Sequence, residues 1–189
     1  GAVSAPATHL PVLALPFGGT AVPGQPQAAN AQGVIQAIET GVALVLRGEA
    51  GAICTAPIHK KALKDGAGFA FPGHTEFLAH LAGVDRVVMM LACDTLRVVP
   101  ATIHIPLSEV PQALTPRLLE ETIRLTHAGL IRDFGLENPV IAVAGLNPHA
   151  GEGGAMGREE LDWIAPLIAA RRREEGFALR GPRPADTMF

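Results

Sequence analysis

The residues best suited to chemistry lie in the segment 139–157, PVIAVAGLNPHAGEGGAMG, around one imidazole and one carboxylate. His149 and Glu152 sit among glycines that follow the apolar run 140–144, which has the length and branching of a buried strand. Glycine lets backbone amides come close to a ligand, and a helix-like stretch, 158–164, follows. Open α/β sheets build ligand sites from this order of elements. The alternative is an ordinary glycine-rich connection with a solvated histidine, and the spacing matches no nucleotide-binding fingerprint.

Three of the seven histidines, His74, His104 and His149, lie where loops meet helices or strands. His74, with Thr75 beside it, opens a predicted helix whose amides and dipole favour an anion. His104 is expected near the end of a strand. Imidazoles from three separate elements could converge on a divalent metal such as Zn, Mn or Co. No two of them are close enough in sequence to form a local chelate, so a structural role stays the alternative for each.

Two further polar residues follow predicted elements closely. Lys60 comes just after a strand end, a position suited to a phosphate or carboxylate of a substrate, although a solvated lysine is the alternative. Asp186 lies in the proline-set loop GPRPADT. A carboxylate held in this way can serve as a catalytic base or orient a ligand, and a helix cap is the ordinary alternative.

Strands and helices alternate along the chain. The apolar runs predict five strands, at 11–16, 52–55, 87–92, 96–107 and 140–144. Helices are expected between Asn30 and Gly48, from Lys60, from His74, over 116–134 and over 161–173. In the helix 116–134 the inner side is predicted to carry the apolar residues Leu118, Leu119, Ile123, Leu130 and Ile131.

The order of these elements sets the expected fold class. The strands 87–92 and 96–107 are separated by three residues only, which favours an antiparallel hairpin inserted into the alternation. The sequence therefore predicts an α/β fold, a three-layer sandwich around a mixed sheet.

Composition excludes several classes of protein. The chain has 189 residues, 48% of them apolar and 17% charged, with a net charge of −3 and no long run of one sign. We therefore expect a globular protein with no nucleic acid and no membrane as partner. Cys54 and Cys93 lie in apolar runs and are interpreted as buried, reduced thiols. With no membrane-length apolar run and no basic start typical of a signal peptide, the predicted location is the cytoplasm.

Five segments together resemble one family, the 4-hydroxythreonine-4-phosphate dehydrogenases of pyridoxal phosphate biosynthesis. The most specific is GLNPHAGEGGAMG at 145–157. The other four occur in the family's order: TAPIHKKAL at 55–63, GHTEFLA at 73–79, MMLACDTLRVVPATIHIPL at 89–107 and GPRPADTMF at 181–189. The resemblance runs through nearly the whole chain.

The resemblance implies a homodimeric enzyme with a fold like the isocitrate dehydrogenases, which uses NAD and a divalent metal (Zn, Mg, Mn or Co). Its reaction would be NAD-dependent oxidation of 4-hydroxythreonine 4-phosphate, with metal-assisted decarboxylation to 3-amino-2-oxopropyl phosphate. Carried over by position, His104 and His149 match two metal ligands, and His74 and Thr75 match a substrate-binding pair. No residue is assigned to NAD. In the family the third metal histidine comes from the partner subunit.

Parts of the family's pattern lie outside residues 1–189. They are the glycine-rich opening, the later His-Asp-Gln-Gly segment with the third metal ligand, and several substrate contacts. The chain is therefore expected to be the central portion of a two-domain dehydrogenase and not to turn over by itself. The alternatives are a related dehydrogenase of 4-phospho-threonate or another hydroxy acid, and a truncated module that only binds ligand or dimerises.

Overall fold

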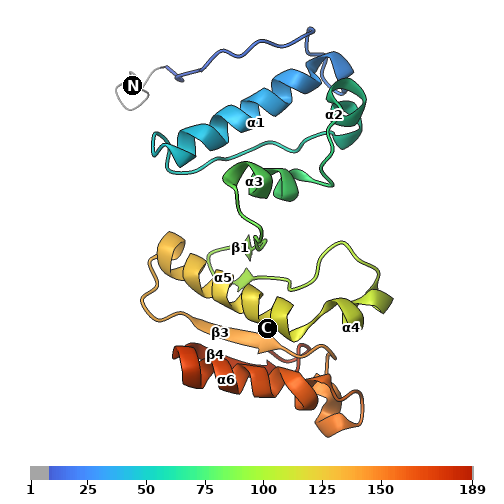
Figure 1. The fold of residues 1–189 in the computed structure, drawn as a ribbon, viewed down its shortest axis with the longest axis vertical. Coiled ribbons are helices and arrows are strands. Elements are labelled where there is room, and N and C mark those ends of the chain that lie inside the picture. Colours follow the sequence, from blue (N-terminus) through green and yellow to red (C-terminus); the bar gives the residue numbers. More distant parts are fainter. Residues whose placement is uncertain (1–8, 189) are drawn as a thin grey trace. The chain divides into compact units, whose positions relative to one another are not determined.

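The chain forms two compact units, residues 1–87 and 88–189, and the computed structural model describes residues 9–188 (Figure 1). Helices and strands are both present, and one strand pair is antiparallel while the other is parallel. The predicted α/β class is therefore confirmed. No helix within the described residues combines the length and the apolar run needed to cross a bilayer.

The first unit is helical. Its elements are the 3-10 turn η2 (Ala28–Asn30) and the helices α1 (Ala31–Leu46), α2 (Lys60–Ala67) and α3 (His74–Ala82). Buried residues of α1 recur at helical spacing, so one face of this helix forms the core. Leu63 of α2 and Phe77 of α3 pack against that face. Phe69, Phe71 and Phe77 form a cluster with ring centroids 5.0–5.5 Å apart.

The two strands expected in this unit are absent. Residues 11–16 and 52–55 have no regular secondary structure. A strand is stable only when its backbone groups pair with a neighbour, and the described part of this unit offers no such neighbour. The helix starts at Lys60 and His74 are confirmed, and both helices end at a glycine with positive φ, Gly68 and Gly83.

The second unit combines two strand pairs with helices. Its first elements are β1 (Leu91–Ala92), β2 (Arg97–Val98), η3 (Leu107–Glu109), α4 (Val110–Ala113) and α5 (Pro116–Phe134). They are followed by β3 (Val140–Ala144), the 3-10 segment η4 (Ala150–Gly154), the π-helical turn η5 (Glu160–Ile164), α6 (Ala165–Glu175) and β4 (Ala178–Arg183).

The helix α5 has the predicted bounds because residues at each end of the segment itself terminate the helix. The Thr115 hydroxyl accepts the Leu118 N–H at 3.2 Å, Pro116 occupies the first turn, and Gly135 ends the helix with φ +65°. The predicted inner face is largely correct. Ile131 is the exception, since it is 41% exposed.

The strands β3 and β4 are parallel neighbours, with Ile141 opposite Leu179. Their buried side chains share one core with α5, η5 and α6. The core consists of Leu119, Ile123, Val143, Ile164, Ile168 and Leu179. Ile164 of η5 and Ile168 of α6 are 1% and 2% exposed, so each of these elements is anchored in the core by a buried isoleucine.

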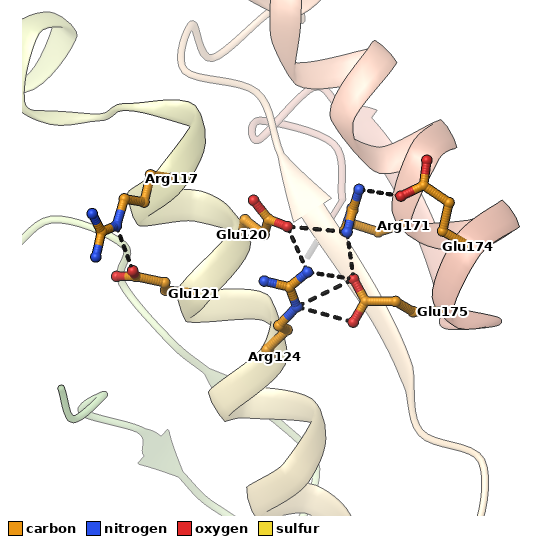
Figure 2. Close-up of polar contacts among 7 residues, drawn as sticks. All are labelled: Arg117, Glu120, Glu121, Arg124, Arg171, Glu174 and Glu175. Atoms are coloured by element: carbon orange, nitrogen blue, oxygen red, sulfur yellow. Dashed lines mark hydrogen bonds and ion pairs between the residues drawn. The ribbon is translucent and has the colours of Figure 1, made fainter. Parts of the chain in front are cut away.

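A network of ion pairs joins α5 to α6 beside this core (Figure 2). Arg124 of α5 contacts Glu120 at 2.6 Å and Glu175 of α6 at 2.8 Å. Arg171 of α6 contacts the same two carboxylates at 3.0 Å and 2.7 Å. Hydrogen bonds from Arg124, and then from Arg171, lower the pKa of Glu175 to about 2.

The predicted hairpin is present but short. β1 and β2 pair over two residues each, Leu91 with Val98 and Ala92 with Arg97. The expected strand 96–107 therefore ends long before His104, and the prediction that His104 lies on a strand is wrong. Cys54 and Cys93 are free, as predicted, but both are exposed.

Candidate functional site

An imidazole and a carboxylate meet beyond the carboxyl ends of β3 and β4. His149 lies in the loop after β3, and Asp186 in the loop after β4. The His149 Nδ1 atom is 2.9 Å from the Asp186 Oδ2 atom. The Asp186 N–H faces the Pro148 carbonyl at 3.4 Å. Parallel neighbouring strands thus bring together two residues that the sequence analysis singled out separately.

This contact fixes which nitrogen of His149 is free. A separation of 2.9 Å fits an Nδ1–H that donates to the carboxylate, which leaves the lone pair on Nε2. Metal-binding histidines commonly have this arrangement, in which a carboxylate orients the ring. The two side chains are 48% and 38% exposed, so the ring is accessible from solvent. His149 and Asp186 therefore fit a metal site as ligand and orienting partner.

The loop that carries His149 is held in an unusual backbone conformation. Gly151, Glu152 and Gly153 have φ of +72°, +42° and +66°. The His149 N–H donates to the Asn147 Oδ1 atom at 2.9 Å. The carboxylate of Glu152, the other candidate in this segment, is exposed.

Sequence reasoning missed one residue under this loop. Glu160, the first residue of η5, is 3% exposed, and its Oε1 atom accepts the Asn147 N–H at 2.9 Å. In the sequence it is one of two adjacent glutamates at the start of a helix, where acidic residues are common. Only the burial of Glu160 distinguishes it from its neighbour Glu159, which is only partly buried.

His104 lies in an exposed loop with φ +58°. Residues 9–188 contain no group of three or more His, Cys, Asp or Glu side chains arranged to hold a metal ion. That His104 joins His149 on one ion stays a prediction. A positive φ is uncommon outside glycine and is found more often at functional sites than elsewhere.

The other candidate residues meet at the start of α3 in the first unit. His74 and Thr75 form the first turn, and the His74 Nε2 atom is buried without a hydrogen-bond partner among the described residues. A Cβ atom on Gly73 would lie 3.7 Å from the Lys60 Nζ atom and 2.8 Å from the Glu76 Oε2 atom. Lys60, His74 and Thr75 are thus grouped around a helix N-terminus, which attracts anions.

Each unit has a sizeable cavity among its described residues. In the first unit, a cavity of about 440 Å³ is lined by Lys60, Lys61, Lys64, Asp65, Phe69, Phe71 and Pro72. The larger cavity, about 650 Å³, runs along β3 and the inner face of α5 in the second unit. Its lining is mostly aliphatic and contains neither His149 nor Asp186. The larger cavity therefore contains none of the candidate site residues.

Comparisons with known proteins identify the family. The chain matches the family described as "Pyridoxal phosphate biosynthetic protein PdxA" over residues 2–189. The chain belongs to the PdxA family. A relative from Ruegeria sp. (strain TM1040), a 4-hydroxythreonine-4-phosphate dehydrogenase, is 63% identical over 188 residues, which are 100% of this chain and 57% of the relative. The resemblance stated from the five segments is therefore confirmed.

Solved structures of PdxA relatives agree with the fold. The crystal structure of the 4-hydroxythreonine-4-phosphate dehydrogenase from Klebsiella pneumoniae has a TM-score of 0.81 and 42% identity, and the match covers 88% of this chain and 50% of that one. A terephthalate 1,2-cis-dihydrodiol dehydrogenase from Burkholderia xenovorans LB400 has a TM-score of 0.66 and 31% identity, with 87% and 52% covered. The chain thus spans about half the length of the relatives it matches.

Proposed function

We propose that this chain is part of an enzyme that oxidises 4-hydroxythreonine 4-phosphate with NAD and then decarboxylates the product to 3-amino-2-oxopropyl phosphate, in pyridoxal 5'-phosphate biosynthesis. The observation that carries the proposal is the His149–Asp186 pair at the carboxyl ends of β3 and β4, in a chain 63% identical to a relative named 4-hydroxythreonine-4-phosphate dehydrogenase. In the overall reaction the alcohol loses a proton and a hydride, and the resulting β-keto acid loses CO₂.

The proposed metal site is assigned to His149 and His104, both in the second unit. His149 would bind a divalent ion, Zn, Mg, Mn or Co, through Nε2, while Asp186 keeps the proton on Nδ1. The bound ion would supply a Lewis acid for the negative charge that develops on the substrate oxygen. Asp186 was predicted as a catalytic residue. Its contact with His149 favours the narrower role of orienting the imidazole.

Binding of the substrate phosphate is proposed at the start of α3, in the first unit. The Lys60 ammonium lies beside the N-cap residue Gly73, as does the carboxylate of Glu76 in the first turn. The unpartnered His74 Nε2 atom and the Thr75 hydroxyl add polar groups at the same helix end. A phosphate bound there would meet a cation, backbone N–H groups and the positive end of the helix dipole. NAD would accept the hydride.

The proposal extends to the whole protein. The chain would be the central portion of a two-domain dehydrogenase of isocitrate dehydrogenase type, with a mixed sheet between two helical layers. The enzyme would be a cytoplasmic homodimer, and a residue of the partner subunit would complete the metal site. The structural match to the Klebsiella pneumoniae enzyme, half of which this chain covers, supports the assignment of the chain to part of a larger enzyme.

A related dehydrogenase is the second candidate. The similarity to a terephthalate dihydrodiol dehydrogenase favours a substrate that is a hydroxy acid of another kind, such as a 4-phospho-threonate or a dihydrodiol carboxylate. Lys60 suits a phosphate and a carboxylate alike, so turnover of the two kinds of substrate has to distinguish the candidates. A module that only binds ligand or dimerises is the non-enzymatic alternative.

A hybrid enzyme tests the proposal. In it the 189 residues replace the aligned segment of the Ruegeria relative, which supplies the remainder of the family's length. The expected result is NADH formation from 4-hydroxythreonine 4-phosphate that stops on metal chelation and in the His149→Ala variant. A hybrid that folds and reduces NAD only with a dihydrodiol carboxylate would favour the second candidate. A folded hybrid without turnover on either substrate would contradict the assignment of an enzyme.

A further inference from the structure

Glu160 is a buried carboxylate with an unusually small set of partners. It is 3% exposed, and of its two oxygens only Oε1 has a hydrogen-bond partner among the described residues. A buried carboxylate with so few partners lowers the free energy of unfolding. Its presence therefore calls for a role that its contacts fulfil. It begins the π-helical turn η5, and π-turns are frequent at functional sites. These facts direct attention to what Glu160 touches.

The contacts of Glu160 lead to His149 in two steps. The Glu160 Oε1 atom accepts the Asn147 backbone N–H at 2.9 Å, and the Asn147 Oδ1 atom accepts the His149 N–H at 2.9 Å. The Asn147 Nδ2 atom also donates to the Met156 carbonyl at 3.2 Å, across the loop. Asn147 is thus fixed from both sides, and it fixes the backbone of His149.

The backbone approaches the same carboxylate closely at two glycines of the loop. A Cβ atom on Gly145 would lie 2.9 Å from Glu160 Oε1, and one on Gly151 would lie 2.9 Å from Glu160 Oε2. The same Cβ atoms would lie 2.9 Å from the Ala150 Cα atom and 2.8 Å from the Gly157 carbonyl, so this backbone, closed over Glu160, requires glycine at both positions. The loop that carries His149 is therefore wrapped around the Glu160 side chain.

We propose that Glu160 is a positioning residue for the His149–Asp186 pair: its carboxylate holds the Asn147 backbone and thereby sets the position of the His149 ring. The inference concerns the same site as the proposed function and rests on it for the role of His149 as a metal ligand. It goes further by assigning the pair's geometry to a residue that touches neither imidazole nor carboxylate.

Nitrogen NMR of the histidine rings tests the inference in the 189-residue chain. At a pH where the imidazoles are neutral, His149 should carry its proton on Nδ1, with its signal assigned by its loss in His149→Ala. Glu160→Ala should abolish this preference and give an average of both tautomers. Glu160→Gln keeps the oxygen that accepts the Asn147 N–H and should retain the wild-type signal. Asn147→Ala should resemble Glu160→Ala, and the double variant should show no further change, because the two residues act in series.

A core variant separates positioning from general loss of stability. Ile168→Ala opens a cavity in the core of the same unit and removes none of the hydrogen bonds of Glu160 or Asn147, so it should lower the melting temperature while His149 keeps its tautomer. The inference is wrong if Glu160→Ala retains the wild-type tautomer, or if Ile168→Ala loses it to the same extent. Titration of the hybrid enzyme with Zn²⁺ separates the positioning role of Glu160 from the metal-ligand role of His149. If wild-type His149 has the Nδ1 proton and Glu160→Ala loses it, but the hybrid enzyme binds no zinc at His149 with or without this substitution, the positioning role of Glu160 stands and the assignment of His149 as a metal ligand fails.

Discussion

The Nδ1 atom of His149 lies 2.9 Å from the Oδ2 atom of Asp186, although the two residues follow different strands. The parallel register of β3 and β4 produces this contact, because both strands end at the same edge and the Gly145 N–H donates to the Arg183 carbonyl just beyond them at 2.9 Å. The strand pair therefore brings His149 and Asp186 together, and the glycine loop sets the backbone conformation around His149.

Removal of the Asp186 carboxylate should weaken metal binding. Asp186→Ala leaves the His149 ring without its orienting partner, and the expected loss of affinity for Zn²⁺ or Co²⁺ is about 10–100-fold. Calorimetric titration of the hybrid enzyme measures it. The matched control is Asp162→Asn, which breaks only the exposed pair with Arg158 and should leave the affinity unchanged. Equal affinities in Asp186→Ala and the wild type would disprove the orienting role.

The two neighbouring lysines at the start of α2 should differ in function. Lys60→Ala should raise KM for the phosphorylated substrate by about 10–100-fold, because a hydrogen bond to a charged group contributes about 1.5–3 kcal/mol. Lys61 is already paired with Asp65 at 2.5 Å and is exposed, so Lys61→Ala should change KM less than about twofold. Steady-state kinetics of the hybrid enzyme provide the comparison, and similar effects of the two variants would remove Lys60 from the site.

Alanine substitutions at two glycines of the His149 loop distinguish a steric clash from backbone strain in their effect on stability. Both Gly151 and Gly153 have positive φ, but a Cβ atom on Gly153 meets nothing within 4 Å, whereas one on Gly151 would lie 2.8 Å from the Gly157 carbonyl. Gly153→Ala should destabilise by about 1–2 kcal/mol through backbone strain alone. Gly151→Ala should destabilise more and should also displace Glu160. Urea unfolding measures both, and equal values would show that the loop does not close tightly over Glu160.

The network between α5 and α6 should make the second unit sensitive to acid. The folded pKa of Glu175 is about 2 against a usual 4.5, so its stabilising contribution is complete above about pH 4.5 and is lost as the pH falls toward 2. Glu175→Gln should lower the melting temperature at neutral pH and flatten its decline over this acidic range. Arg117→Gln breaks the separate pair with Glu121 on α5 (Figure 2) and should leave the acid dependence as in the wild type. An unchanged acid profile in Glu175→Gln would contradict the network's contribution.

Local signals explain which elements could be predicted from the sequence. The helix α5 has its N-cap at Thr115, proline in its first turn and glycine after its last, so its bounds are encoded within the segment itself. The apolar run of β3 and the start of α3 after Gly73 are similar cases. Segments 11–16 and 52–55 have the composition of strands, but strand formation depends on a partner that composition does not reveal.

The sequence identified most residues of the candidate site, but not which of them lie in contact. His149 and Asp186 were each identified from the motifs that contain them, and their pairing required the register of two strands. Glu160 was missed because its role depends on burial under a loop that precedes it. His104 was placed on a strand because its segment alternates, whereas the residue lies in a loop with φ +58°.

Anomalous diffraction at the zinc edge from crystals of the hybrid enzyme tests the central claim most directly. The account predicts a zinc ion about 2.0–2.1 Å from the Nε2 atom of His149 and from a ring nitrogen of His104, with His149 Nδ1 still in contact with Asp186. A zinc ion bound away from His149, or one held through Nδ1 with Asp186 displaced, would contradict it.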